Sequence, residues 1–251
     1  AFVIVSAWLG WQAAWNIAAA LLLVIALPVI ASLYAREREP EPARPSAGPT
    51  RTARDWTRSE VVADPMFYAL LTGVLAPAFI GTTIFFHQDY LVNLRGFDPL
   101  AFASAFPLMA LTTAGFALIA GYCIDRFGAI AMLPYFLIPL AIASAAAALM
   151  TQVWSVYVFM CLLGVSYGFS SSLFGALWPE VYGVRHLGSI RSMIVAAMVF
   201  GTAIGPGLTG YLIDNGVGLP AQLLWMSGWC IAGCAVMAIA ARTLTQRSMQ
   251  V

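Results

Sequence analysis

Long apolar runs separated by short polar segments dominate the chain. A helix needs about 20 apolar residues to cross the roughly 30 Å hydrocarbon core of a bilayer. The runs are continuous and do not alternate apolar with polar positions, so they predict helices and not the strands of a β-barrel. Seven segments are long enough to span a membrane: Trp11–Tyr34, Met66–Phe86, Ala101–Ile124, Ala129–Met150, Val153–Trp178, Ser192–Ile213 and Leu219–Ala241.

The polar segment from residue 36 to residue 64 differs in kind from these runs. It contains four prolines and alternates arginine with glutamate, a composition that cannot bury a core and predicts a flexible linker. Near its end, Thr57 and Glu60 stand at the spacing of a capping box. They predict a short surface helix before Pro65, which opens the next span.

Composition places the chain in the membrane class. Hydrophobic residues make up 61% of the chain and charged residues 9%, whereas a soluble domain carries about a quarter charged residues. The predicted fold is therefore all-α and integral to the lipid bilayer. No basic stripe points to nucleic acid as a partner. The cysteines form no CxxC pair and no histidine lies near them, so we expect neither a metal nor a cofactor.

Arginine sets the expected orientation, because the chain contains no lysine. If the seven spans alternate in direction, only Arg95 falls on one side of the membrane. Positive charge marks the cytoplasmic face, so we expect the long loop and the C-terminus in the cytoplasm of a multi-pass cell-membrane protein. The arginines expected on the cytoplasmic side are Arg36, Arg38, Arg44, Arg51, Arg54, Arg58, Arg126, Arg185, Arg191, Arg242 and Arg247.

Four parts follow from this layout. They are the last helix of an N-terminal half at 1–35, a cytoplasmic linker with a short surface helix at 36–64, a six-helix transmembrane bundle at 65–241 and a cytoplasmic tail at 242–251. The chain begins inside an apolar run and without Met. We therefore interpret it as a fragment that needs the rest of an N-terminal six-helix half.

A repeated pentapeptide divides the last six spans into two triplets. Gly-Tyr-x-Ile-Asp ends the middle helix of each triplet, at Gly121–Asp125 and at Gly210–Asp214. Three is an odd number, so the second triplet is inverted in the membrane relative to the first. Secondary transporters commonly contain such inverted repeats. Chance similarity between two apolar sequences is the alternative.

Three stretches resemble the major facilitator superfamily of transporters. The family's loop between the second and third helices of each half is similar to Gly121-x-x-x-Asp125-Arg126-x-Gly128. Its eleventh helix carries a pattern similar to Gly201-x-x-x-Gly205-Pro206-Gly207-x-x-Gly210, and its sixth helix begins with one similar to Gly10-Trp11-Gln12-x-x-Trp15. The resemblance implies that the chain is the family's C-terminal half, from the sixth helix onward.

The resemblance also implies roles for these residues. Asp125 would sit near a helix N-terminus, accept backbone hydrogen bonds and latch neighbouring helices on the cytoplasmic side. Arg126, Glu180, Arg185 and Arg191 are its expected partners there, unless they are solvated loop charges. Small residues permit close helix packing in lipid and Pro206 can bend a helix. The expected packing or hinge set is Gly201, Gly205, Pro206, Gly207 and Gly210; static packing alone is the alternative.

The resemblance further implies a substrate cavity between the two six-helix halves, near mid-membrane. Aromatic walls with a few hydroxyls suit a small organic solute; the alternative is that the hydroxyls bond backbone carbonyls and the aromatics simply pack. His87-Gln88 resembles a pair in carboxylate-handling, oxalate/formate-like members, which favours an organic acid. His87 and Asp89 are candidates for coupling to a proton or counter-ion. The expected cavity residues are Phe79, Thr82, Thr83, Phe86, Ser166, Tyr167 and Ser170.

Three other classes compete with a transporter. A retinal protein needs a lysine for its Schiff base, and the chain has none. A seven-helix receptor or a non-transporting membrane subunit stays open, although neither explains the pentapeptide. An intramembrane enzyme needs clustered His, Asp or Glu at one depth, whereas His87 and His186 fall on opposite sides, so we expect no enzyme.

Overall fold

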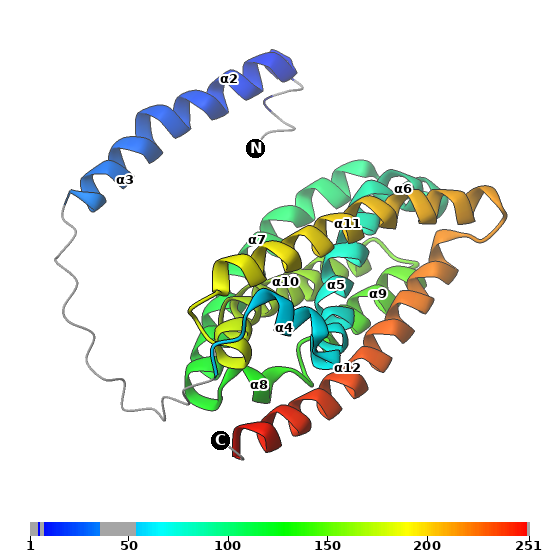
Figure 1. Cartoon of the computed structure of the whole chain (residues 1–251). Helices are drawn as coiled ribbons and strands as arrows, with labels where there is room; N and C mark the ends of the chain where they lie inside the picture. Colours follow the sequence, from blue (N-terminus) through cyan, green and yellow to red (C-terminus); the bar gives the residue numbers. More distant parts are fainter. Residues whose placement is uncertain (1–4, 6–7, 36–53, 250–251) are drawn as a thin grey trace. The chain divides into compact units, whose positions relative to one another are not determined.

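The computed structural model describes residues 5, 8–35 and 54–249. The chain divides into two compact units, Ala1–Thr50 and Arg51–Val251. All regular structure in the described residues is helical (Figure 1), which confirms the predicted fold class. The predictions made for residues 1–4 and for the proline-rich part of the linker, 36–53, lie outside the described residues.

The first unit contains the predicted span Trp11–Tyr34 as one helical run. It consists of α2 (Trp11–Leu21), a π-helical turn η1 (Leu22–Ala26) and α3 (Leu27–Tyr34). Pro28 stands at the start of α3 and has no N–H for the preceding turn, which gives a reason for the local widening. None of its most apolar stretch is buried within the unit. A helix that is apolar all round is typical of a membrane span.

The second unit contains the other helices. They are α4 (Arg58–Ala63), α5 (Pro65–Phe86), α6 (Gln88–Arg95), α7 (Pro99–Phe127), α8 (Ala129–Met132), α9 (Ile138–Leu149), α10 (Trp154–Tyr182), α11 (Leu187–Asp214) and α12 (Leu219–Met249). Five of the six spans predicted in this unit are single long helices; with the run in the first unit, six helices of the described residues are long and apolar enough to cross a membrane.

The fourth predicted span, Ala129–Met150, is not one helix. It is broken into α8 and α9 by a turn at residues 133–137. Pro134 lies in this turn and cannot donate the hydrogen bond that a continuous helix needs. Leu133, Phe136 and Leu137 in the break are fully buried, so the irregular backbone is shielded by protein.

One boundary also differs from the prediction. The tail predicted at 242–251 continues α12 as far as Met249, because no proline or glycine interrupts the sequence there. The short helix predicted before Pro65 is confirmed as α4. Glu60 accepts a hydrogen bond from the backbone N–H of Thr57 at 2.8 Å, as the capping box requires.

Contacts between helix ends confirm that the spans of the second unit alternate in direction. Asp64, before α5, bonds Tyr182 at the end of α10 and Arg247 near the end of α12. Glu180 of α10 bonds Ala129 after the end of α7. We call this side of the unit the arginine-rich end, because Arg126, Arg185, Arg191 and Arg247 lie there. At the opposite end, Arg95, the last residue of α6, donates to Ala148 O of α9 at 2.5 Å.

The same helix pairs are obtained when the helices of the first triplet are exchanged for those of the second. The principal pairs are α7 with α10, α5 with α11, α9 with α10, α5 with α12, and α9 with α12. Exchanging α5, α7 and α9 for α10, α11 and α12 turns the first pair into the second, the third into the fourth, and the last into itself. Burial follows the same rule: 50% of the apolar stretch is buried in both α5 and α10, and 11% in both α7 and α11.

Candidate functional site

The repeated pentapeptide predicts a register between the triplets. Gly121 and Gly210 differ by 89 positions (210 − 121 = 89). If the triplets are repeats, each residue of the first triplet corresponds to the residue 89 positions later in the second. Each contact between α7 and α10 should then have an equivalent contact between α11 and α5 at the corresponding residues.

Helices α7 and α10 approach closely at two glycines of α10. A Cβ on Gly164 would lie 2.1 Å from Thr112 Oγ1. A Cβ on Gly168 would lie 2.4 Å from Thr113 O and 3.1 Å from Phe116 Cβ. Only glycine fits at these two positions, and this close backbone contact is how small residues stabilise helix pairs in lipid.

Helices α5 and α11 make the equivalent contact, but here the glycines lie on α11 and the larger residues lie on α5. A Cβ on Gly201 would lie 3.4 Å from Leu75 Cδ2, and one on Gly205 would lie 3.4 Å from Phe79 Cδ2. Adding 89 to 75 and 79 gives 164 and 168, the glycines of α10; subtracting 89 from 201 and 205 gives 112 and 116. The contacts therefore repeat in register at these two positions, as the inverted repeat predicts.

The rest of the predicted packing set is divided. Gly205 is buried and also faces Thr83, whose Oγ1 would lie 2.6 Å from an added Cβ. Gly210 faces His87, whereas Gly207 has nothing within 4 Å. Pro206 lies inside α11. Three of the glycines thus face α5, and their role in movement stays a prediction.

Helices α5 and α10 cross at Gly81 and Tyr167. A Cβ on Gly81 would lie 1.8 Å from the Tyr167 hydroxyl, so the phenol occupies the space that a side chain would fill. Phe85 lies one turn beyond Gly81 and packs on the Tyr167 ring at 6.4 Å between centroids. Tyr167 therefore packs between the two central helices instead of standing free in a cavity.

The predicted cavity hydroxyls differ in their partners. Thr82 Oγ1 donates to Ala78 O at 2.8 Å, which is the backbone bond that the alternative interpretation required. Thr83, Ser166 and Ser170 are buried, and their hydroxyls have no hydrogen-bond partner among the residues that the structure describes. Other hydroxyls in these spans, such as Thr113, donate to a backbone carbonyl of their own helix, so these three are polar groups that could bind a solute.

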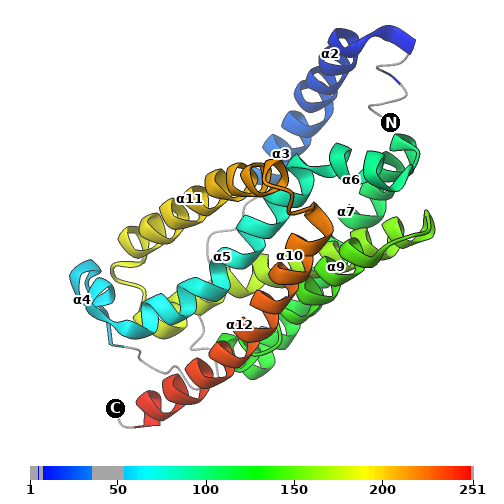
Figure 2. The ribbon, with the colours of Figure 1, turned by 90° about the vertical axis from the view of Figure 1, so that its right-hand side faces the viewer.

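A hollow of about 550 Å³ lies beside the α5–α11 contact. Helices α11 and α12 diverge from their connecting turn with α5 between them (Figure 2). Phe79 and Trp229 meet edge to face across it at 5.6 Å. Of the predicted cavity residues Phe79 lines the hollow, and its walls are almost wholly apolar: Leu75, Phe79, Ala196, Ala197, Phe200, Gly201, Ile204 and Trp229.

The two candidate coupling residues lie in different settings. His87 is half-buried after the end of α5; its Nδ1 is 3.2 Å from Thr83 O, and its Nε2 would lie 3.8 Å from a Cβ on Gly210. Because a carbonyl can only accept, Nδ1 is the donor and Nε2 is left as the acceptor. Phe86 is exposed and packs on the His87 ring, while Asp89 is exposed in the first turn of α6.

The loop after α7 is arranged around Glu180 and not around Asp125. Glu180 accepts a hydrogen bond from Ala129 N at 2.6 Å, and its Oε1 would lie 3.1 Å from a Cβ on Gly128. Gly128 has a φ of 87°, which favours glycine. Asp125 is exposed, and within the described residues we find no hydrogen bond or ion pair to it. The backbone contact expected of Asp125 is thus made by Glu180.

The predicted cationic partners also make other contacts. Arg126 donates to the Tyr122 hydroxyl at 3.2 Å on its own helix. Arg191 donates to Gly175 O at 3.3 Å and so joins α11 to α10. The backbone N–H of Arg185 donates to Asp55 at 3.2 Å. The gate predicted from these residues is therefore not closed by ion pairs to Asp125 in this structure.

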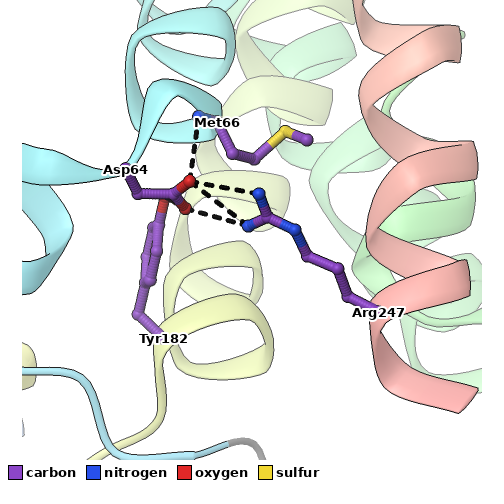
Figure 3. A network of polar contacts seen from close by, with 4 residues as sticks. All are labelled: Asp64, Met66, Tyr182 and Arg247. Carbon is purple, nitrogen blue, oxygen red and sulfur yellow. Dashed lines mark hydrogen bonds and ion pairs between the residues drawn. The ribbon is translucent and has the colours of Figure 1, made fainter. Parts of the chain in front are cut away.

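A polar cluster at the arginine-rich end was not predicted. The carboxylate of Asp64 is buried and accepts hydrogen bonds from Arg247, Tyr182 and Met66 N (Figure 3). The Asp-Pro pair at 64–65 indicates a helix N-cap in the sequence. Nothing in the sequence links it to residues more than 100 positions away.

No three His, Cys, Asp or Glu side chains gather into a metal site in the part of the chain that the structure describes.

The model of the Major Facilitator Superfamily matches residues 2–206 of the chain and, in a second overlapping match, residues 95–248. The chain belongs to the major facilitator superfamily. No curated protein matches it. Membership in this transporter family and the six long apolar helices make it a multi-pass membrane transporter, whose partners include a small-molecule substrate and the lipid bilayer.

Proposed function

We propose that the protein is a secondary active transporter that works by alternating access on a small organic solute. The observation that carries the proposal is the reversal of the two glycine contacts between α7–α10 and α5–α11. Two inverted triplets can take up two related arrangements around one site, which is the structural basis of alternating access. A receptor has no need of this symmetry.

The solute site that we propose lies at the α5–α10 crossing, on the side formed with an N-terminal half. Thr82 and Phe86 stand one turn apart on the less buried side of α5. The unpaired Ser166 and Ser170 are one turn apart on α10. An organic acid is the favoured solute. His87 is the proposed proton carrier, because Nδ1 donates to Thr83 O and this leaves Nε2 as the ring's acceptor.

We further propose that the arginine-rich end is cytoplasmic and that an N-terminal six-helix half completes the transporter. The positive-inside rule supports the orientation. The assignment of Trp11–Tyr34 to the end of the first half rests on its resemblance to the family's sixth helix and on its length and apolar character. Asp125 and Arg126 remain candidates for a gate in another state of the cycle, since both are exposed at this end.

The experiment is uptake into proteoliposomes that contain the full-length protein. Radiolabelled organic acids are compared with neutral sugars and amines, each with and without an inward proton gradient. We expect saturable uptake of an acid that the gradient accelerates and that His87→Ala abolishes. Saturable uptake of a sugar with no effect of the gradient would contradict both the organic acid as the solute and the coupling role of His87. Uptake of none of the classes would favour the non-transporting alternatives.

A further inference from the structure

The end of the linker lies along the connection between α10 and α11. Trp56 N donates to Tyr182 O at 3.0 Å. Asp55 Oδ1 accepts from Val184 N and Arg185 N, both at 3.2 Å. One backbone bond and two bonds to the Asp55 carboxylate thus attach this segment to a turn about 130 residues later in the sequence. Residues 54–56 are therefore part of the second unit.

Gly183 makes this attachment possible. Its φ of 79° is in the region that favours glycine. A Cβ there would also lie 2.4 Å from Asp55 Oδ1 and 3.0 Å from Asp55 Cα. A larger residue would have a strained backbone and would push the linker away. Both the positive φ and the close approach of Asp55 therefore require glycine at position 183.

Asp64 attaches the other end of the same segment. Its side chain is 4% exposed, and it binds both terminal nitrogens of Arg247 at 3.1–3.3 Å and the Tyr182 hydroxyl at 3.2 Å (Figure 3). A single buried carboxylate therefore holds the start of α5, the end of α10 and the last turns of α12. A buried carboxylate needs its partner, because an unpaired charge in this position is strongly unfavourable.

Aromatic contacts fill the space between the two attachments. Trp56 packs edge-on against Tyr182 at 5.5 Å, and Tyr182 stacks on Trp178 at 6.3 Å with an interplanar angle of 7°. Phe67 of α5 contacts Trp178 in turn. Tyr182 thus bonds or packs against the linker segment at its backbone, its ring and its hydroxyl.

We propose that residues 54–64 form a strap that holds the arginine-rich end of α10 in place, and that Asp64 is the positioning residue of this strap in the transport cycle. The strap joins the linker to the ends of α10 and α12, so displacement of the linker acts on these helix ends through the Asp64–Arg247 pair. The second part of this inference rests on the proposed function, since it assigns the strap to the movement that opens this end. The first part concerns the structure alone.

The test uses the full-length protein with its four cysteines replaced by alanine. A Gly175→Cys substitution reports on the arginine-rich half of α10, where its side chain would have free space, and an Asn93→Cys substitution, exposed on α6, reports on the opposite end. We compare Asp64→Asn and Arg247→Gln with the matched controls Asp214→Asn and Arg242→Gln, which change exposed residues of the same kinds. The readouts are N-ethylmaleimide reaction rates, amide hydrogen exchange of residues 182–187 and solute turnover.

We expect Asp64→Asn and Arg247→Gln to speed exchange at 182–187 and labelling of the α10 reporter thiol by about tenfold each, the scale of a local opening that loses one buried contact. Labelling of the α6 reporter thiol stays unchanged, and both control variants leave every rate as it was. The doubly substituted protein changes no more than either single variant, because the pair acts as one unit. Turnover changes in both single variants while expression is kept. Tyr182→Phe, which removes only the hydroxyl, gives an intermediate effect.

Unchanged exchange and labelling in Asp64→Asn and in Tyr182→Phe would overturn the strap. Faster exchange with unaltered turnover would overturn its role in the cycle. Absence of uptake in the unsubstituted protein would count against the proposed function only, since exchange and labelling still measure the strap.

Discussion

The tight contact between α7 and α10 predicts that Gly168→Ala destabilises the protein although alanine is the better helix former. The added Cβ would lie 2.4 Å from Thr113 O and 2.8 Å from Ala117 N. Both are backbone atoms of α7, so relief to an ordinary contact requires the helices to separate by about 1 Å. Overpacking costs about 1–3 kcal/mol, against a gain of roughly 1 kcal/mol in helix propensity. The same change at Gly164 meets Met109 O at 2.5 Å and must behave alike.

The assay is thermal unfolding of the purified protein in detergent, followed by tryptophan fluorescence. The net loss is up to about 2 kcal/mol, which lowers the midpoint by up to about 8 °C in a unit of this size. Gly115→Ala on α7 is the matched control, because nothing lies within 4 Å of its Cβ. Gly201→Ala, at 3.4 Å from Leu75, is expected to stay within about 1 kcal/mol of the unsubstituted protein. Equal midpoints for Gly168→Ala and Gly115→Ala would refute the close packing at this contact.

Three further predictions concern the arginine-rich end. Glu180→Gln weakens a charge-assisted bond to Ala129 N and is expected to cost about 1–2 kcal/mol of stability in the same unfolding assay; a midpoint equal to that of the unsubstituted protein would contradict it. Asp125→Asn is expected to leave the midpoint unchanged and to slow solute turnover, and unaltered turnover would end its role as a gate. The pKa of Glu60 lies below its ordinary value of 4.5. The largest cause is the hydrogen bond from the Thr57 backbone N–H, followed by the bond from the Thr57 hydroxyl and by the nearby Arg54 cation. The cap of α4 is therefore stabilised above pH 4.5 and lost as the pH falls through the lowered pKa. NMR titration of Glu60 tests this; an unshifted pKa in the unsubstituted protein would contradict the cap, and a Thr57→Ala variant with the same pKa would contradict the contribution of the hydroxyl.

The sequence was sufficient to predict the helices and their directions. Continuous apolar runs predict spans because lipid requires every backbone bond to be satisfied within the helix, and the end contacts confirm the alternation inferred from arginine. The broken fourth span escaped prediction because a hydropathy window does not register Pro134 in the middle of an apolar run. The capping box before Pro65 was predicted because both of its partners are local.

The site was harder to predict than the spans. The pentapeptide gave the register of the repeats, but the exchange of Gly164 and Gly168 for Leu75 and Phe79 becomes visible only when the helices are packed. Glu180 and Asp125 are both acidic residues at one end of the unit, and sequence alone does not tell which one reaches the loop. The Asp64–Arg247 pair joins residues that no local pattern connects.

The measurement that tests the account most directly is the accessibility of a single cysteine at the α5–α10 crossing. In a cysteine-free full-length protein, a Thr82→Cys variant is labelled with a membrane-impermeant maleimide in right-side-out and in inside-out vesicles. The account predicts labelling from both sides, with solute shifting the ratio between them, because an inverted repeat exposes one site alternately. Labelling from one side only, unaffected by solute or by a proton gradient, would contradict alternating access.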